Sequence, residues 1–143
     1  MKTTQLINKL FNDNNFVGND IFNYEYEGFS FEHNMLLYYS RLAKKTPNKA
    51  GYFVTFWRKE DKVNRSFDES DKFDFLIVNI VDEEKKGYLL FNKKDLIKHG
   101  IISSQNKKGK MGFRVYPNWE KNLNSTAIKT QSWQLNYFYE YPI

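Results

Sequence analysis

The apolar side chains of this chain follow two periods, and the change between them falls near residue 29. Leu6, Ile7, Leu10 and Phe11 recur at helical spacing, which predicts a helix over residues 4–11. Beyond residue 29, apolar and polar side chains alternate in short runs separated by turn-forming residues, a pattern typical of strands. Such runs occupy residues 29–33, 35–43, 52–58 and 113–116.

One further run differs from these because it is apolar on both faces. Residues 74–81 read Asp-Phe-Leu-Ile-Val-Asn-Ile-Val, which predicts a central strand covered on both sides. A charged turn leads from it to another predicted strand over residues 88–91. The preceding residues 59–72 are charged and polar, so we expect them to form an exposed loop.

Two helices are predicted in the second half of the chain. Asn92 and Asp95 have the spacing of a helix cap, and the short helix that they begin is expected to end at Gly100. A final helix is predicted from residue 124 or 125 to about residue 138. The order helix, strands, short helix, strand, helix indicates an α+β or mixed α/β fold.

The length of 143 residues is that of one domain. We therefore predict a single domain over residues 1–143, in which residues 1–23 form the N-terminal helix and a connection. No apolar run approaches the roughly 20 residues of a membrane-spanning helix. The chain is expected to be cytoplasmic, with no membrane partner.

The amino-acid composition argues against several kinds of functional site. The chain has no cysteine, which excludes a disulfide partner, a thiol nucleophile and a zinc ribbon. It has two histidines, too few for a histidine-rich metal site. Neither common glycine-rich phosphate loop occurs, which argues against nucleotide hydrolysis and dinucleotide redox chemistry.

Charge is strongly segregated along the chain. Residues 41–59 hold six Lys/Arg and no Asp/Glu, and residues 85–129 hold eleven against two, so these stretches together carry a formal +15 in a chain of +5. Many aromatic residues lie within them, and basic surface interleaved with rings suits nucleic acid. An ordinary solvated surface is the alternative. The candidate nucleic-acid-binding residues are Arg41, Lys44, Lys49, Arg58, Arg114, Trp119, Lys129 and Gln134.

Asp74 is the carboxylate with the most suggestive position. It begins the buried strand, and the neighbouring strand is followed by Lys93. Magnesium-dependent nucleases place an acid and a lysine in this way to hold a metal ion and the attacking water. Phe91 stands where such enzymes carry the second carboxylate. Asp74 is therefore a candidate ligand of Mg²⁺ or Mn²⁺, and a simple role at the strand end is the alternative.

The final helix carries an amide among its apolar positions. Helical projection places Gln131 on one stripe with Ala127, Ile128, Leu135 and Phe138. A buried amide needs hydrogen-bond partners, because an unsatisfied one costs about 1–3 kcal/mol. Gln131 could bond a carbonyl at the sheet edge, or it could face a cleft together with Gln134.

Several segments together resemble the MepB family, from about Tyr24 to the C-terminus. They are "RLAKKTPNKAGYFVTFWRK" (41–59), "SDKFDFLIV" (70–78), "GYLLFNKKDLIKHGII" (87–102), "GFRVYPNW" (112–119) and "AIKTQSWQLNYF" (127–138). The resemblance implies a fold like that of restriction-type endonucleases, with a central mixed sheet flanked by helices and a nucleic-acid surface. It also makes Asp74, Lys93 and Gln131 the candidate catalytic residues. A glutamate at position 25, 27 or 32 could replace the missing second carboxylate.

Three functional hypotheses follow. The first is a nucleic-acid-binding protein, with DNA favoured, on an endonuclease-like scaffold without efficient cleavage. The second is an active nuclease that uses Mg²⁺ or Mn²⁺. The third is a protein that binds a small molecule or another protein and is linked to drug resistance, because the family takes its name from a gene beside a multidrug export pump. The sequence leaves the oligomeric state open.

Overall fold

The computed structural model describes residues 1–141 and shows a mixed α/β domain, which confirms the predicted fold class. Its elements are α1 (Lys2–Leu10), β1 (Asn15–Asn19), the 3-10 helix η1 (Ile21–Tyr26), β2 (Phe29–His33), β3 (Leu36–Lys45), β4 (Tyr52–Thr55), β5 (Trp57–Glu60), β6 (Val63–Ser66), β7 (Phe75–Asp82), β8 (Lys85–Asn92), α2 (Lys93–Lys98), β9 (Gly112–Val115), α3 (Ser125–Gln134), the 3-10 helix η2 (Leu135–Tyr137) and β10 (Phe138–Glu140).

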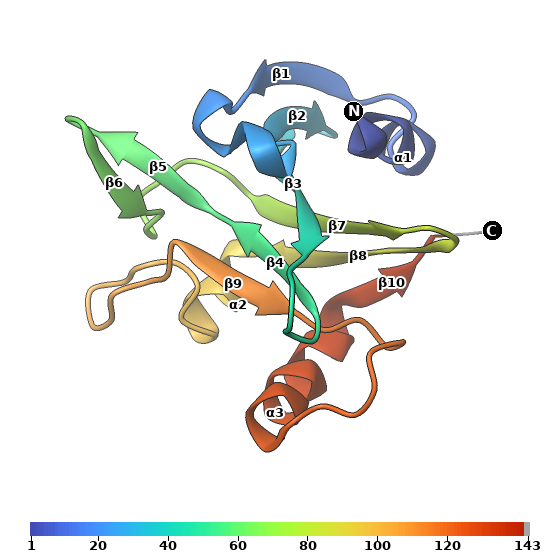
Figure 1. Cartoon of the computed structure of the whole chain (residues 1–143). Helices are drawn as coiled ribbons and strands as arrows, with labels where there is room; N and C mark the ends of the chain where they lie inside the picture. The colour runs from blue at the N-terminus through green and yellow to red at the C-terminus, as the bar shows by residue number, and fades with distance from the viewer. Residues whose placement is uncertain (142–143) are drawn as a thin grey trace.

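The main sheet has the order β1-β2-β3-β7-β8-β10, and β4 and β9 continue it from the end of β3. β3 and β7 are parallel, whereas the other pairs are antiparallel, so the sheet is mixed. Figure 1 shows α1 beside β2 and β3, and α3 at the far side of the molecule below β9 and β10. The β5–β6 ribbon projects away from the main sheet (Figure 1).

β7 is buried on both faces, as its apolar sequence predicts. Ile77 belongs to the cluster under α1, where it joins Ile7, Phe31 and Tyr38. Leu76 and the other alternate residues of β7 point to the larger cluster on the opposite face. The two clusters together make β3 and β7 the centre of the fold.

The predicted strand over 52–58 and the predicted loop over 59–72 are both wrong in part. The strand breaks at Phe56, whose ring is fully buried and stacks on Phe67 at 4.3 Å. Beyond the break, β5 and β6 form a two-stranded ribbon whose residues are polar except for Trp57 and Val63. Hydrophobic periodicity gives no sign of such a ribbon, because neither of its faces is buried in the core.

Candidate nucleic-acid interface

Asp74 and Lys93 lie at the same end of the β7–β8 pair, since the register places Phe75 opposite Asn92. The carboxylate of Asp74 accepts a hydrogen bond from the backbone N–H of Leu37 at 2.8 Å, and the N–H of Asp74 donates to the Leu37 carbonyl at 2.8 Å. These bonds extend the pairing of β3 with β7 by one residue. Asp74 thus makes the contacts expected of a simple role at the strand end.

The ammonium of Lys93 also has local partners. It donates to the backbone carbonyl of Asp71 and lies 5.1 Å from the centre of the Phe73 ring. This geometry holds the loop before β7 against the start of α2. The loop in turn supplies the Asp71 carboxylate to Arg58, as described below.

The candidate metal site at Asp74 has few possible ligands in the part of the chain that the structure describes. No group of three or more His, Cys, Asp or Glu side chains within residues 1–141 is arranged to hold a metal ion. Of the three candidate glutamates, Glu25 and Glu32 are exposed, and Glu27 accepts bonds from the N–H and hydroxyl of Thr3 at the start of α1. These residues do not fit a Mg²⁺ or Mn²⁺ site, so we derive no cleavage step from them.

Gln131 lies on α3, away from this pair. Its amide donates to the carbonyls of Pro117 and Glu120 at 2.9 and 3.2 Å, which ties the turn after β9 to the helix. Gln131 therefore bonds backbone carbonyls, although these belong to a loop and not to a sheet edge. The predicted apolar stripe is wrong in part, because Ile128 and Leu135 are 54% and 39% exposed, although Ala127 is buried.

The buried amide of α3 is Gln134, which is fully buried. Its oxygen accepts from the N–H of Tyr116 at 2.8 Å, and its nitrogen donates to the carbonyl of Arg114 at 2.8 Å. The amide therefore pairs with β9 as the backbone of a neighbouring strand would. Burial in these contacts leaves Gln134 without a surface for nucleic acid.

Two of the candidate cations are held inside the fold. The guanidinium of Arg41 is 1% exposed, lies over the Phe56 ring and pairs with Asp20 at 2.6 Å. Burial lowers its pKa to about 10, so Arg41 remains protonated at neutral pH. Arg58 donates to Asp71 at 3.1 Å, and this hydrogen bond raises the pKa of Arg58.

Trp119 is likewise used within the fold. Its indole N–H donates to the hydroxyl of Tyr52 at 3.0 Å, and that hydroxyl donates to Asp82 at 2.6 Å. Its ring also packs edge-on against Phe138 at 5.7 Å. The remaining candidates, Lys44, Lys49 and Lys129, are exposed.

Arg114 organises the turn between β3 and β4. Its guanidinium donates to the Thr46 hydroxyl at 2.8 Å and to the Ala50 carbonyl at 3.1 Å. Gly51 has φ of +76°, and a Cβ there would lie 2.7 Å from the Tyr116 ring. The glycine therefore permits the close contact that brings this lysine-bearing turn onto β9.

A cleft of about 360 Å³, which we call the β9–α3 cleft, opens between these two elements. Phe53, Tyr116 and Trp133 contribute rings to its lining, and Arg114 and Lys110 contribute cations. Its lining residues, all within the described residues 1–141, include no carboxylate. The arrangement offers flat apolar surface beside positive charge.

His99 closes the α2 side of this cleft. Its ring stacks on Trp133 with centroids 3.8 Å apart and an interplanar angle of 6°. Burial lowers the pKa of His99, the nearby Lys98 lowers it further, and Asp95 opposes the change. A neutral imidazole is therefore favoured. Lys110 and His99 are not among the candidate residues predicted from the sequence. The packing of β9 against α3 brings these two residues together, and such a tertiary contact leaves no local pattern in the sequence.

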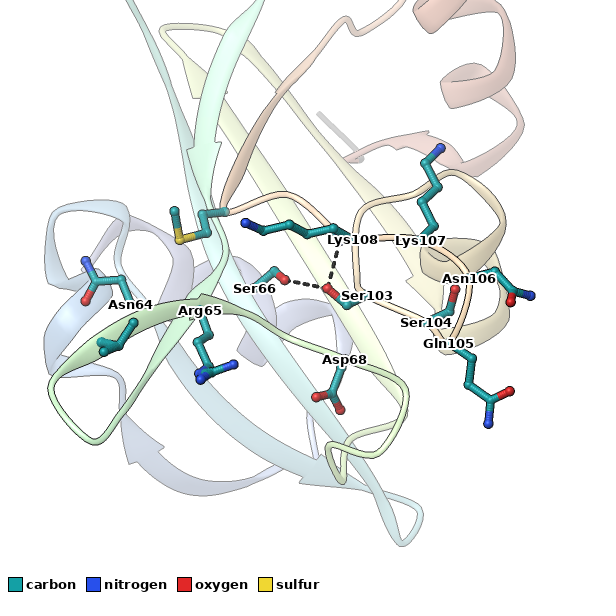
Figure 2. A pocket seen from close by; sticks show the side chains of 13 residues that line it. Asn64, Arg65, Ser66, Asp68, Ser103, Ser104, Gln105, Asn106, Lys107 and Lys108 are labelled. Carbon is teal, nitrogen blue, oxygen red and sulfur yellow. Dashed lines mark hydrogen bonds between the residues drawn. The ribbon is translucent and has the colours of Figure 1, made fainter.

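A second, more polar groove of about 670 Å³ lies between β6 and the loop over residues 103–111. Figure 2 shows Lys108 reaching across from this loop toward β6, whereas Lys107 points away. A hydrogen bond of 2.7 Å between the hydroxyls of Ser66 and Ser103 joins the two walls. The carboxylate of Asp68 is in the lining, and Arg65 pairs with Glu60 at 2.9 Å. Within the described residues, the groove therefore differs from the β9–α3 cleft in having a carboxylate and no aromatic ring in its lining.

Comparison with known proteins places the chain in a family of mixed α/β proteins. The model of the family described as MepB-like matches residues 20–140, so this protein belongs to the MepB-like family. It is similar to a solved structure described as "Crystal Structure of MepB", with 40% identity and a TM-score of 0.87 over 98% of this chain and 97% of that one. No curated protein matches it. No helix within residues 1–141 is long and apolar enough to span a membrane.

Proposed function

We propose that this protein binds nucleic acid through the β9–α3 cleft, on a scaffold like that of restriction-type endonucleases. The observation that carries the proposal is the combination of aromatic rings, Arg114 and Lys110 in a cleft lined without a carboxylate. Rings can stack on bases of any sequence, and cations beside them can neutralise phosphates. Exposed Lys44, Lys49 and Lys129 add positive charge on the elements that surround the cleft.

Unpaired bases are the part of a nucleic acid that fits this cleft. Bases in a duplex are stacked on one another, so they cannot also stack on protein rings without being extruded. We therefore expect a single strand to bind more tightly than a duplex of the same sequence. Single-stranded DNA is the first ligand to test, with RNA of the same sequence beside it.

The test is fluorescence anisotropy with a labelled single strand and its duplex, between about 50 and 200 mM salt. Affinity should fall as salt rises, because counterions leave the phosphates on binding. Lys110→Gln should lower affinity several-fold and reduce the salt slope by about 1. Lys9→Gln, which removes an exposed charge from the last turn of α1, is the matched control and should change neither value.

Two results would overturn this proposal. One is an affinity that does not depend on salt, and the other is an equal loss in the Lys110 and Lys9 variants. We also expect no efficient cleavage. Plasmid incubated with the protein and Mg²⁺ or Mn²⁺ should remain intact, and nicking that Asp74→Ala abolishes would instead establish the nuclease hypothesis.

A further inference from the structure

A further cavity, separate from the cleft and the groove described above, lies between η1, β3 and β5. Its volume is about 410 Å³, and its lining residues do not overlap with those of the β9–α3 cleft. Its charged lining residues are Asp20, Arg41, Arg58, Lys59 and Asp71. We call it the Arg41 cavity.

The Arg41 cavity has more hydrogen-bond donors than its own acids use. The Nε of Arg41 is buried and has no partner within residues 1–141, although the other two nitrogens of the guanidinium bond Ser40 and Asp20. The terminal nitrogens of Arg58 are 3.4 and 3.6 Å from Glu60 and Asp68, which are long contacts. A buried N–H without an acceptor is unfavourable, because it has lost its bond to water.

Tyr39 adds another donor. Its ring stacks on Phe73 at 4.9 Å, which fixes the direction of the side chain. Burial and the charge of Asp71 raise the pKa of its hydroxyl, while Arg41 and Arg58 act in the opposite direction. The hydroxyl is therefore protonated at neutral pH. Tyr39 lines the cavity, and no hydrogen bond found within the described part of the chain uses its hydroxyl.

The acids of the Arg41 cavity, in contrast, are already occupied. Asp20 accepts from Arg41 at 2.6 Å, from Asn23 at 2.9 Å and from the N–H of Phe22 at 3.2 Å. Asp71 accepts from Arg58 at 3.1 Å and from the N–H of Asp68 at 2.8 Å. Acids that are satisfied in this way stay in place and leave the remaining donors for a ligand.

The walls determine what else the ligand must offer. Phe22, Phe29 and Phe67 line the cavity, and a volume of about 410 Å³ is within the range of small-molecule sites. We propose that the Arg41 cavity binds a small aromatic oxyanion, a flat ring that carries a carboxylate or a phosphate. Its oxygens accept from the Tyr39 hydroxyl and the Arg58 guanidinium, the positive charge of the buried Arg41 beside them attracts them, and its ring packs on the phenylalanines. This inference does not depend on the nucleic-acid proposal.

Isothermal titration calorimetry with two pairs of probes tests it. Benzoate represents a carboxylate and adenosine 5′-monophosphate a phosphate, and benzamide and adenosine are their uncharged counterparts. At least one anion should bind, its counterpart should bind at least about tenfold more weakly, and the anion that binds identifies the source of the negative charge.

Tyr39→Phe is the decisive variant, because it keeps the stacked ring and removes the hydroxyl alone. It should weaken anion binding about tenfold with an unchanged melting temperature. Arg58→Gln should weaken binding too, whereas Lys110→Gln should leave it unchanged. The inference is wrong if neither anion binds at millimolar concentration, if the uncharged probes bind equally well, or if Tyr39→Phe binds as tightly as the original protein. Loss of binding in Lys110→Gln alone would move the site to the β9–α3 cleft and would also overturn it.

Discussion

The Arg41 cavity and the β9–α3 cleft are two places where cations meet aromatic rings, and they use the cations differently. In the cavity, Arg41 is buried and shares a short ion pair with Asp20. In the cleft, Arg114 spends its hydrogen bonds on a turn at the surface, and Lys110 is exposed. Basic residues that look alike in the sequence therefore have two roles, and the nearby acids decide which. The pairing of Arg41 with Asp20 stabilises the fold in addition to the proposed place of Arg41 beside an anion, whereas the proposed role of the exposed Lys110 is contact with a ligand alone.

Removal of Asp20 from the Arg41 cavity should change the stability of the protein more than any other proposed substitution. Asp20→Ala leaves the buried guanidinium of Arg41 without its counter-charge, which should lower the free energy of unfolding by about 3–5 kcal/mol. Urea unfolding followed by tryptophan fluorescence measures this change.

The matched control is Asp13→Ala. Asp13 is 69% exposed and contacts His33 at 2.9 Å, so its loss should cost less than about 1 kcal/mol. Equal losses in the two variants would show that burial does not distinguish these ion pairs.

Around the β9–α3 cleft, substitution of Gln134 should lower the free energy of unfolding the most. Gln134→Leu leaves the N–H of Tyr116 and the carbonyl of Arg114 without partners, which should lower the free energy of unfolding by about 2–4 kcal/mol. Gln131→Leu removes bonds from partly exposed carbonyls and should cost about 1 kcal/mol. A larger loss at Gln131 than at Gln134 would contradict the assignment of the buried amide.

The smallest expected effect is a dependence on pH through His99. Its pKa in the folded state lies below the ordinary value of 6.5, so the unfolded chain takes up a proton first as pH falls. This contribution to stability is complete above about pH 6.5 and is lost as pH falls toward the folded pKa. Urea unfolding between about pH 7.5 and 5.5 should show the decline. His99→Gln should reduce it, and an identical decline in that variant would assign it to other groups.

The sequence predicts local structure best where one short segment contains the whole signal. Asn92 and Asp95 form the expected reciprocal cap of α2, with both hydrogen bonds present. The doubly apolar run of β7 is central, as expected, although β8 is longer than its apolar part because it continues to residue 85. These features need no knowledge of the rest of the fold.

The final helix shows why other parts of the fold are harder to predict from the sequence. It ends at Gln134, and Phe138 begins β10 where the sequence predicts continued helix. The segment from α3 into η2 is short and carries apolar residues on two sides. Ile128 and Leu135 lie on one side, and Trp133 and Tyr137 lie on the other. Hydrophobic periodicity alone therefore does not predict which side is buried. The contact with β9 makes that choice. The same contact forms the β9–α3 cleft. The sequence therefore identifies Arg114 and Gln134 as candidate binding residues, but it does not predict which groups they contact.

The amide of Gln134 has a consequence beyond holding the helix. Within residues 1–141, β9 pairs with β4 alone, so its other side is a sheet edge that no neighbouring strand covers. Such an edge can pair with a strand of another molecule and lead to aggregation. Gln134 occupies the N–H of Tyr116 and the carbonyl of Arg114, two groups that a second copy would need. One side chain therefore closes these two groups of the edge to pairing with a second copy.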